Sequence, residues 1–422
     1  MARAFPSGGY RSSGNVFGFS FPGGRGGETR RQPMREFDIA IVGAGPAGSA
    51  TAIDLAQRGL SVVLIDRAIF PRDKLCGDFV NPINWPILDE LDVSEEILTR
   101  PHTKVTGFRV TAASGREAFA ALPAVRERVF GVGIRRFHLD EVLLRRAQRA
   151  GASVWEGAKV NGIEANASGW RVAFEHTNTP GSVHAKLLVG ADGRNSVIVQ
   201  RLGIPSAQQS ARSASVGFEV QLKNVGMVGH NVEIHQFAGG YAGLLRLDAD
   251  TLNLCLALRQ AQLGKTPSFD NLRRDALDSN RFLQTLLRDA EPIGALRSVW
   301  PVYFSRRRYG GDGFLLVGDA AGVTEPVTGE GIFFALRSGQ LAARTIAAAW
   351  PAGSLDAALV RQYQRACREN FAARLRLNSA IRFLVYRPQY FDAALRLMAG
   401  QRWVLDSLVK RVVCLAHPAY GA

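Results

Sequence analysis

The sequence predicts a fold of the α/β (α+β) class, in which a Rossmann-like domain is interleaved with an antiparallel β-sheet domain and followed by a helical C-terminal region. Three observations predict it. Near the N-terminus, two apolar runs of the buried-strand type flank a segment with helical spacing. Residues 212–258 alternate apolar and polar side chains between turn signals, as antiparallel strands do. From Leu355 onwards the pattern is that of helices.

The first elements form a strand–turn–helix–strand unit. Phe37–Val42 (FDIAIV) and Val62–Ile65 (VVLI) are short apolar runs typical of buried strands. Between them, Pro46–Arg58 carries small and apolar residues at helical spacing and stops at Gly59. This order predicts a βαβ unit at the start of the Rossmann-like domain.

The later elements divide the chain further. Hairpins are expected at residues 105–122 and 159–174, with an amphipathic helix between them, and Phe314–Val317 is another buried strand before a long helix from Gly331 to about Trp350. We therefore expect five segments: a disordered tail at 1–33; the first part of the Rossmann-like domain at 34–200, with a hairpin insertion near 103–130; a β-sheet substrate domain at 201–300; the second part of the Rossmann-like domain at 301–350; and a helical region at 351–422.

Composition limits the classes of protein that this chain can be. Its 422 residues are 46% hydrophobic and 21% charged, which is typical of a soluble globular chain and excludes a wholly disordered, collagen-like or coiled-coil protein. The Gly-, Ser- and Arg-rich residues 1–33 have no apolar run of a signal peptide, and Met34 is a candidate start. Four widely spaced cysteines argue against a disulfide framework or a zinc site and favour a cytoplasmic location.

The charge is strongly basic. Lys and Arg number 52 against 37 Asp and Glu, giving a net charge of +15. Arg-rich codon usage is one explanation, and a surface that attracts an acidic partner, substrate or anionic lipid is the other. We find no nucleic-acid-binding module and no metal-ligand spacing among the seven histidines, so neither nucleic acid nor a metal is predicted.

A glycine-rich turn carries the first chemical signal. Gly43, Gly45 and Gly48 form GxGxxG at the junction of the first strand and helix, with Pro46 and Ala47 inside it. The first Gly permits the turn, the second lets a pyrophosphate approach the backbone, and the third lets the helix pack closely. Asp66 ends the next strand, where a carboxylate would accept the ribose hydroxyls. A dinucleotide is therefore predicted.

Two downstream segments favour FAD over a nicotinamide as the resident dinucleotide. Apolar strands deliver Asp192 with Gly193 in LLVGADGRN and Asp319 with Gly318 in FLLVGDAAG. A nicotinamide dehydrogenase has no use for a second acidic residue so far downstream, whereas an extended FAD needs one for its ribityl chain.

These motifs resemble a known family. With FPRDKLCGD at 70–78, ADG at 191–193 and GDAAGVTEPVTGEGI at 318–332, the chain is similar to FAD-dependent oxidoreductases of the p-hydroxybenzoate hydroxylase superfamily, in the geranylgeranyl-reductase-like branch. The resemblance implies that Asp192 lies near the flavin pyrophosphate and Asp319 on the ribityl chain. It also implies that Cys76 and Asp78 line the reaction chamber as catalytic candidates. The further cofactor-binding residues that it implies are Arg67, Lys74, Arg136, Val160, Gly329, Glu330, Gly331 and Ile332.

Motifs that are absent from the sequence limit the reactions that this chain can catalyse. The sequence contains one GxGxxG motif and therefore no second nucleotide-binding domain for a resident nicotinamide. NADH, NADPH or a protein must then deliver electrons transiently. Prenyl reductases of this branch carry Tyr-x-Trp-x-Phe-Pro, where Tyr241–Arg246 here reads YAGLLR, and the halogenase Trp-x-Trp-x-Ile-Pro motif is also absent. We therefore favour a monooxygenase that hydroxylates an aromatic substrate, free or on an acidic protein or carrier. A reductase of isoprenoid double bonds with peripheral membrane contact is the alternative, and a non-catalytic flavoprotein scaffold is the third hypothesis.

One strand of the β-sheet domain holds further polar candidates. Glu233, His235 and Phe237 alternate and therefore share one face. That face could cover the substrate, but we expect it to be exposed to solvent.

Overall fold

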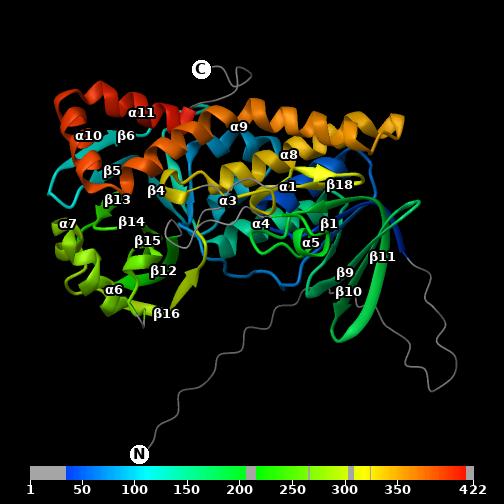
Figure 1. Cartoon of the computed structure of the whole chain (residues 1–422), viewed down its shortest axis with the longest axis horizontal. Helices are drawn as coiled ribbons and strands as arrows, with labels where there is room; N and C mark the ends of the chain where they lie inside the picture. The colour runs from blue at the N-terminus through cyan, green and yellow to red at the C-terminus, as the bar shows by residue number, and fades with distance from the viewer. Residues whose placement is uncertain (1–34, 206–214, 265–266, 303–307, 324, 415–422) are drawn as a thin grey trace, which may run out of the picture. The chain divides into compact units, whose positions relative to one another are not determined.

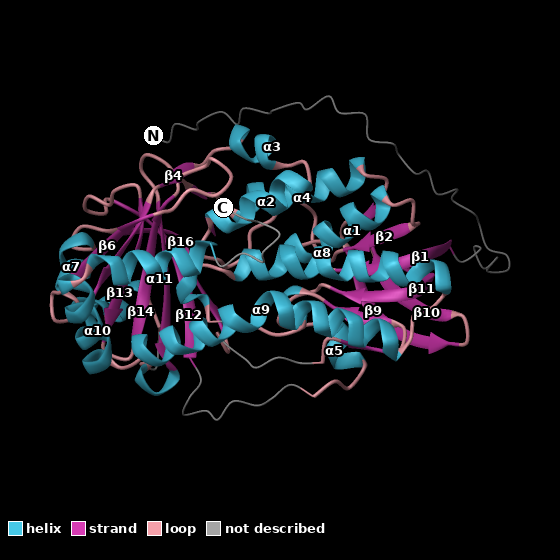
Figure 2. Ribbon diagram, turned by 90° about the horizontal axis from the view of Figure 1, so that it is seen from above, coloured by secondary structure: helices cyan, strands magenta, loops and turns pink. Residues whose placement is uncertain are grey.

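The computed structural model describes residues 35–205, 215–264, 267–302, 308–323 and 325–414. The predictions for the tail at 1–33 and for Met34 fall outside the described residues. The described part contains two large sheets, connecting helices and three C-terminal helices, and it has the α/β class predicted from the sequence (Figures 1 and 2).

The first sheet carries the Rossmann-like core. Its strand order is β17-β18-β11-β1-β2-β8, and β1 runs parallel to both β11 and β2. Strands β9 and β10 extend β11 as an antiparallel hairpin. The strands span β1 Arg35–Val42, β2 Val62–Ile65, β8 Ser153–Trp155, β9 Ala158–Asn166, β10 Gly169–His176, β11 Thr179–Gly190, β17 Gly310–Gly311 and β18 Phe314–Leu316.

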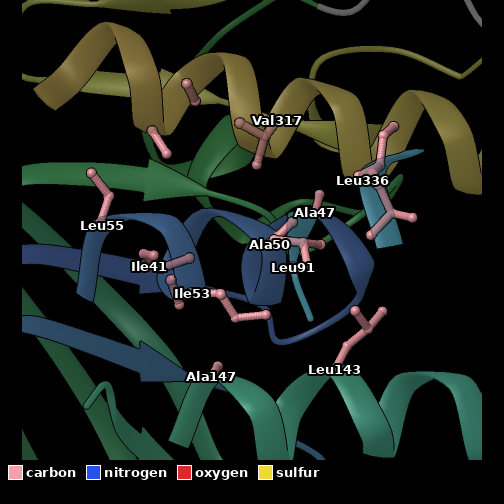
Figure 3. Packing of buried hydrophobic residues seen from close by; sticks show 14 of the residues in the cluster. Ile41, Ala47, Ala50, Ile53, Leu55, Leu91, Leu143, Ala147, Val317 and Leu336 are labelled. Atoms are coloured by element: carbon pink, nitrogen blue, oxygen red, sulfur yellow. The ribbon is translucent and has the colours of Figure 1, made fainter. Parts of the chain in front are cut away.

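Helices α1 (Pro46–Gln57), α4 (Arg136–Arg149) and α8 (Gly331–Ala349) cover this sheet. Figure 3 shows α1 between α8 on one side and α4 on the other, with Ala47 and Ala50 turned to Leu336. Small residues allow this approach, because a Cβ on Gly339 of α8 would lie 2.4 Å from the Ala47 carbonyl oxygen. The core of the first sheet is thus closed by three helices, of which α1 follows directly from its strand β1.

The second sheet has the order β16-β12-β15-β14-β13-β5-β6. The hairpin expected near 103–130 forms β5 and β6, and β5 runs parallel to β13, so this hairpin completes the second sheet. The strands span β5 Gly107–Thr111, β6 Glu117–Ala121, β12 Ser215–Lys223, β13 Asn231–Phe237, β14 Gly240–Arg246, β15 Leu252–Arg259 and β16 Glu291–Val299, and a small third sheet joins β3 Phe79–Val80, β4 Thr103–Val105 and β7 Gly131–Gly133.

Helices pack against both faces of the second sheet. One face packs against α6 (Phe269–Asp275) and α7 (Arg281–Leu286), and the other packs against residues of α9 (Ala357–Val385), α10 (Pro388–Gly400) and α11 (Arg402–Cys414). The other short helices are α2 Trp85–Glu90, α3 Ser94–Thr99 and α5 Val197–Arg201. Among the described helices, none is both long and apolar enough to cross a bilayer.

The expectation that Glu233, His235 and Phe237 face solvent is wrong. Their exposed fractions are 1%, 0% and 0%, because α6 and α7, which lie between β15 and β16 in the chain, cover this face. His235 Nδ1 lies 2.8 Å from the hydroxyl of Thr111, and His235 Nε2 lies 3.1 Å from Glu233 Oε2. Asn280 closes the group by donating to Thr111 Oγ1 at 3.0 Å. The polar pattern of this strand therefore reflects a buried hydrogen-bonded network and not a wet surface.

Helix α9 joins the two sheets. Near its start, the Tyr363 hydroxyl donates to the Leu316 carbonyl in β18 at 3.1 Å. Just beyond its end, the Tyr386 carbonyl accepts a hydrogen bond from Arg259 of β15 at 3.1 Å. Figure 2 shows α9 running from the first sheet to the second. Helix α9 therefore bridges the two sheets.

Candidate functional site

The ends of the central strands meet where the sequence predicts the phosphate cradle. Gly43 follows β1 with a φ of +102°, and its N–H donates to the Ile65 carbonyl at 2.7 Å. A Cβ on Gly43 would lie 2.4 Å from the Ala191 carbonyl oxygen, and a Cβ on Gly48 would lie 1.8 Å from the Gly43 carbonyl oxygen. The turn therefore has no room for a side chain at either position.

In front of this turn there is space. A Cβ on Gly45 would meet only the Arg72 Nη2 atom, at 3.7 Å. Gly45 is the N-cap of α1, and Pro46 starts the helix, a position where its missing N–H costs nothing. The N–H groups of the first turn, which no helical carbonyl can accept, begin at Ala47. This opening has the chemistry of a phosphate site.

Asp66 closes the turn from the end of β2. Its Oδ2 accepts the Ala44 N–H at 2.7 Å, and its Oδ1 accepts the Ala68 N–H at 2.8 Å. The half-buried carboxylate keeps lone pairs that ribose hydroxyls can use. Arg67 beside it is exposed, whereas Val160 of β9 is buried in the core of the sheet.

Asp192 and Gly193 follow β11. Asp192 Oδ2 accepts the Val197 N–H at 2.6 Å, while its buried Oδ1 has no hydrogen-bond partner within the described residues. Burial raises the pKa of this carboxyl group. Gly193 has a φ of +79°, and a Cβ there would lie 3.7 Å from Lys74 Nζ. Lys74 therefore reaches the same turn from a separate loop.

The end of β18 packs against the start of α1. Gly318 has a φ of +57°, its N–H donates to Ser338 Oγ at 2.8 Å, and a Cβ on it would lie 2.9 Å from Ala47 Cβ. Asp319 follows, half-buried, in the 3₁₀ turn Gly318–Ala320. The two acidic residues predicted from separate motifs thus both stand at the carboxyl edge of the first sheet.

The start of α8 is the open part of the predicted flavin segment. Gly329 has a φ of +66°, and Glu330 caps the helix from a buried position. A Cβ on Gly331 would meet nothing within 4 Å, whereas Ile332 is buried. The N–H groups of this first turn can therefore be reached by a ligand, and the helix dipole favours negative charge there.

A polar stripe on α9 holds this segment from behind. Arg374, which is 2% exposed, forms an ion pair with Glu330 at 2.5 Å and donates to the Val412 carbonyl of α11 at 2.9 Å. One turn later, Asn378 donates to the Thr328 hydroxyl at 2.8 Å. Because all these groups are buried, the position of Glu330 depends on α9 and, through Val412, on α11.

The same stripe reaches Glu325. Arg382 donates to Glu325 Oε2 at 2.9 Å, and the Tyr241 hydroxyl of β14 donates to Oε1 at 2.6 Å. Burial raises the pKa of Glu325, and the guanidinium of Arg382 opposes the shift. The segment before α8 is therefore tied to α9 and to the second sheet.

The Cys76 loop meets the second sheet. The Cys76 N–H donates to Glu219 Oε2 at 3.1 Å, and the Cys76 carbonyl accepts from Asn253 Nδ2 at 2.8 Å and from the Cys255 thiol at 3.2 Å. Arg297 completes this contact by donating to Glu219 Oε1 at 2.7 Å. Three side chains of the sheet thus hold the backbone of this loop, and Arg297 holds one of the three.

Asp78 is buried under the same strands. Its carboxylate accepts the Arg136 N–H at 3.1 Å and Asn253 Nδ2 at 3.0 Å. Burial, reinforced by Glu219, raises the pKa of Asp78 to about 8. Burial also raises the pKa of the Cys76 thiol. At neutral pH both groups are therefore mainly protonated.

Two cationic groups lie behind this loop. Arg136 forms a bidentate ion pair with Asp140, both contacts at 2.6 Å, and Arg72 approaches the same carboxylate at 3.0 Å. Burial lowers the pKa of Lys74, and Arg136 adds to the shift. The predicted residues Lys74, Cys76, Asp78 and Arg136 are therefore brought together.

Sequence reasoning assigned no role to several residues of this region. Glu325 stands inside the quoted segment 318–332, but nothing local indicates its partners. Tyr241 begins the stretch compared with the prenyl-reductase motif, but that comparison gave it no role. The others come from strands and from α9, far from any motif, and their signal is only a polar side chain in an apolar pattern: Glu219, Asn253, Cys255, Arg297, Arg374, Asn378 and Arg382.

The residues present fit FAD on three observations. The space at Gly45 would take a pyrophosphate, and the unpartnered Oδ1 of Asp192 lacks a donor that a ligand could supply. The open first turn at Gly331 can face an electron-accepting ring. A dinucleotide cradle on one sheet, joined to a second sheet that covers a polar loop, defines the class of FAD-dependent oxidoreductases.

The chain belongs to the FAD binding domain family, whose model matches residues 36–377. Among curated proteins it is 28% identical over 334 residues to menaquinone reductase of Mycobacterium tuberculosis, covering 74% of this chain and 78% of that one. It is 26% identical over 343 residues to digeranylgeranylglycerophospholipid reductase 1 of Methanothermobacter thermautotrophicus, covering 80% and 83%.

Solved structures with the same fold include two kinds of flavoprotein. A flavin-dependent brominase has a TM-score of 0.76 at 22% identity, covering 90% of this chain and 94% of that one. A geranylgeranyl bacteriochlorophyll reductase-like protein of Thermoplasma acidophilum has a TM-score of 0.76 at 21% identity, covering 92% and 98%. These likenesses place the fold among the FAD-dependent halogenases and reductases.

Proposed function

We propose that this FAD-dependent oxidoreductase is a monooxygenase that hydroxylates an aromatic substrate with NADH or NADPH as a transient reductant. In the overall reaction, the substrate C–H, O₂, NAD(P)H and a proton give the C–OH product, water and NAD(P)⁺. Bound FAD supplies the redox chemistry, and the protein supplies orientation and exclusion of water.

The observation that carries the proposal is an unused acceptor at Asn253. Its Nδ2 donates to the Cys76 carbonyl and to Asp78, which fixes the amide orientation. Its Oδ1 is then buried without a hydrogen-bond partner within the described residues. Because an unpaired buried acceptor is costly, a ligand with an O–H or N–H donor is the partner it favours. A phenolic ring offers such a donor, and an isoprenoid double bond does not.

Cys76 and Asp78 are the residues we propose to line the reaction chamber. With a pKa of about 8, Asp78 holds a proton at neutral pH and can release it just above. That range suits proton exchange with a phenol better than an ordinary carboxylate would. Replacing Cys76 or Asp78 by Ala is expected to lower turnover while FAD stays bound.

The test uses the FAD-loaded protein and a panel of phenols. We expect one or more phenols to stimulate NAD(P)H oxidation with O₂ uptake and formation of a hydroxylated product. Asn253→Leu removes the acceptor Oδ1 and leaves the phenol O–H without a partner in a buried site. It should therefore raise the KM for that phenol by roughly tenfold or more. Cys255→Ala is the matched control, because it removes a donor to the same Cys76 carbonyl but leaves Asn253 Oδ1 in place.

Reduction of an isoprenoid double bond is the second candidate. It is supported by the 26–28% identity to proteins named digeranylgeranylglycerophospholipid reductase and menaquinone reductase. Under argon, this activity would reoxidise the reduced protein when a prenyl alkene is added, with no oxygen consumed. That result, together with phenols that stimulate no O₂ uptake, would replace the monooxygenase proposal.

A further inference from the structure

Helix α9 has two unlike faces. Its inner face carries the buried residues Tyr363, Arg374 and Asn378, which contact β18 and the segment before α8. Its outer face repeats basic residues at helical spacing and is exposed: Arg361, Arg365, Arg368 and Arg376. The helix is therefore amphipathic, and the outer stripe along its first five turns is basic except for Glu369, which pairs with Arg365.

Exposed apolar side chains continue this stripe. Phe383 of α9 is 50% exposed and stacks on Tyr390 of α10, with ring centroids 5.8 Å apart. Leu397, two turns after Tyr390 on the same side of α10, is 60% exposed, and Trp403 at the start of α11 is 66% exposed. Figures 1 and 2 show α9, α10 and α11 together on one side of the described chain. We call the exposed side chains of these three helices the C-terminal face.

The C-terminal face is strongly basic. Within α9–α11, the exposed acidic residues are Glu369 and Asp406. The exposed basic residues outnumber them and are Arg361, Arg365, Arg368, Arg376, Arg396, Lys410 and Arg411. Basic residues with Trp, Tyr, Phe and Leu on exposed helices are the composition of segments that lie in a membrane interface.

We propose that the C-terminal face docks this protein on the surface of an anionic lipid bilayer. The basic stripe matches the charge of acidic headgroups. The four apolar side chains, with Phe383 and Tyr390 stacked together, are exposed on the helices, where they can enter the headgroup region and need no complementary pocket. A second polypeptide with an acidic surface is the competing occupant, but it would have to pack against these exposed apolar side chains.

The first experiment is flotation of the FAD-loaded full chain with vesicles. We expect it to float with phosphatidylcholine vesicles that contain about 30% phosphatidylglycerol, and to remain behind with pure phosphatidylcholine. Binding should fall by roughly tenfold or more between 0.1 and 0.5 M NaCl, because exposed charges are screened at high salt.

Variants of the C-terminal face test whether it is the surface that binds the vesicles. Leu397→Ser with Trp403→Ser should weaken binding to the anionic vesicles by about tenfold or more, through the apolar area that no longer enters the interface. The matched control is Ile69→Ser with Met227→Ser, which changes two apolar residues that are 74% and 91% exposed on other elements. Arg365→Glu with Arg368→Glu tests the charge and keeps the proposal testable if the apolar variant does not fold.

Three results would overturn the proposal. One is the absence of flotation with anionic vesicles at low salt. Another is flotation that neither set of variants on α9–α11 reduces relative to the control. The third is binding to polyglutamate that the charge variant abolishes while vesicles bind nothing, which would assign the C-terminal face to an acidic polypeptide.

Discussion

At the β1–α1 turn the chain is shaped by backbone atoms, whereas at the Cys76 loop and the start of α8 it is held by buried side chains from distant elements. Gly48 faces the carbonyl oxygen of Gly43 in the same turn, and Gly43 faces the carbonyl oxygen of Ala191, directly after β11. The second region depends on charged pairs such as Arg374 with Glu330, which come from positions 44 residues apart. The structure of the first region should therefore be disrupted by an added side-chain atom, and that of the second by the loss of one member of a buried pair.

The largest effect should come from adding one methyl group to the first region. In Gly48→Ala the new Cβ would lie 1.8 Å from the Gly43 carbonyl oxygen, so the turn or α1 must move. We expect bound FAD to fall below roughly a tenth of the protein, since the phosphate site is made of this backbone. The flavin-to-protein absorbance ratio after gel filtration measures it.

Gly264→Ala is the control, because its Cβ would meet only Asp275 Oδ2 at an ordinary 3.7 Å. A Gly48→Ala protein that keeps a full complement of FAD would show that the turn is not the phosphate site.

In the second region, removing one member of the buried ion pair between Arg374 and Glu330 should strongly destabilise the fold. Arg374→Met leaves the Glu330 carboxylate buried without its guanidinium, which costs about 3–5 kcal/mol of unfolding free energy. The double variant with Glu330→Gln should recover much of that loss, because no uncompensated charge remains. Urea unfolding of the FAD-free protein gives both values.

The control for this pair lies on the same helix. Arg365 pairs with Glu369 at 2.9 Å on the exposed side, and Arg365→Met should change stability by less than about 0.5 kcal/mol. If Arg374→Met and Arg365→Met cost the same, the contrast between the two faces of α9 is wrong.

In the second region, the raised pKa of Asp78 makes the stability of the protein depend on pH. Its pKa is about 8 when folded and roughly 3.9 when unfolded. Because the folded pKa is raised, the contribution of Asp78 to stability is complete below pH 4 and is lost as the pH rises towards 8. The loss is at most about 1.4 kcal/mol per pH unit.

Asp78→Asn removes this group, so the unfolding free energy of the FAD-free variant should depend less on pH between 5 and 8 than that of the unchanged protein. The difference in slope is the measurement, because the amide also alters the contacts with Asn253 and Arg136. Equal slopes would mean that Asp78 is ionised in the folded protein at neutral pH.

The contrast between the two regions also explains what the sequence could predict. The turn at Gly43 is local: strand, glycines, helix and Asp66 lie within 30 residues, so the pattern alone places them. The α/β fold follows from the same kind of local periodicity. Nothing local pairs Arg374 with Glu330 or Asn253 with Cys76, because those contacts exist only after two sheets and α9 have packed.

The error at Glu233, His235 and Phe237 has the same origin. Alternating polar residues on a strand predict a solvent face only if nothing covers that face. Here α6 and α7 do so, and Thr111 and Asn280 satisfy the polar atoms.

The smallest expected effect concerns Tyr241, where the second sheet touches Glu325. Tyr241→Phe removes the donor at 2.6 Å from Glu325 Oε1 but leaves Arg382 at 2.9 Å from Oε2. Because the guanidinium keeps the carboxylate paired, we expect a loss of only about 1–2 kcal/mol in unfolding free energy. Tyr390→Phe, on a 48% exposed side chain, should change nothing measurable. A loss as large as that of Arg374→Met would mean that hydrogen bonds from the second sheet, and not the ion pairs from α9, position the segment before α8.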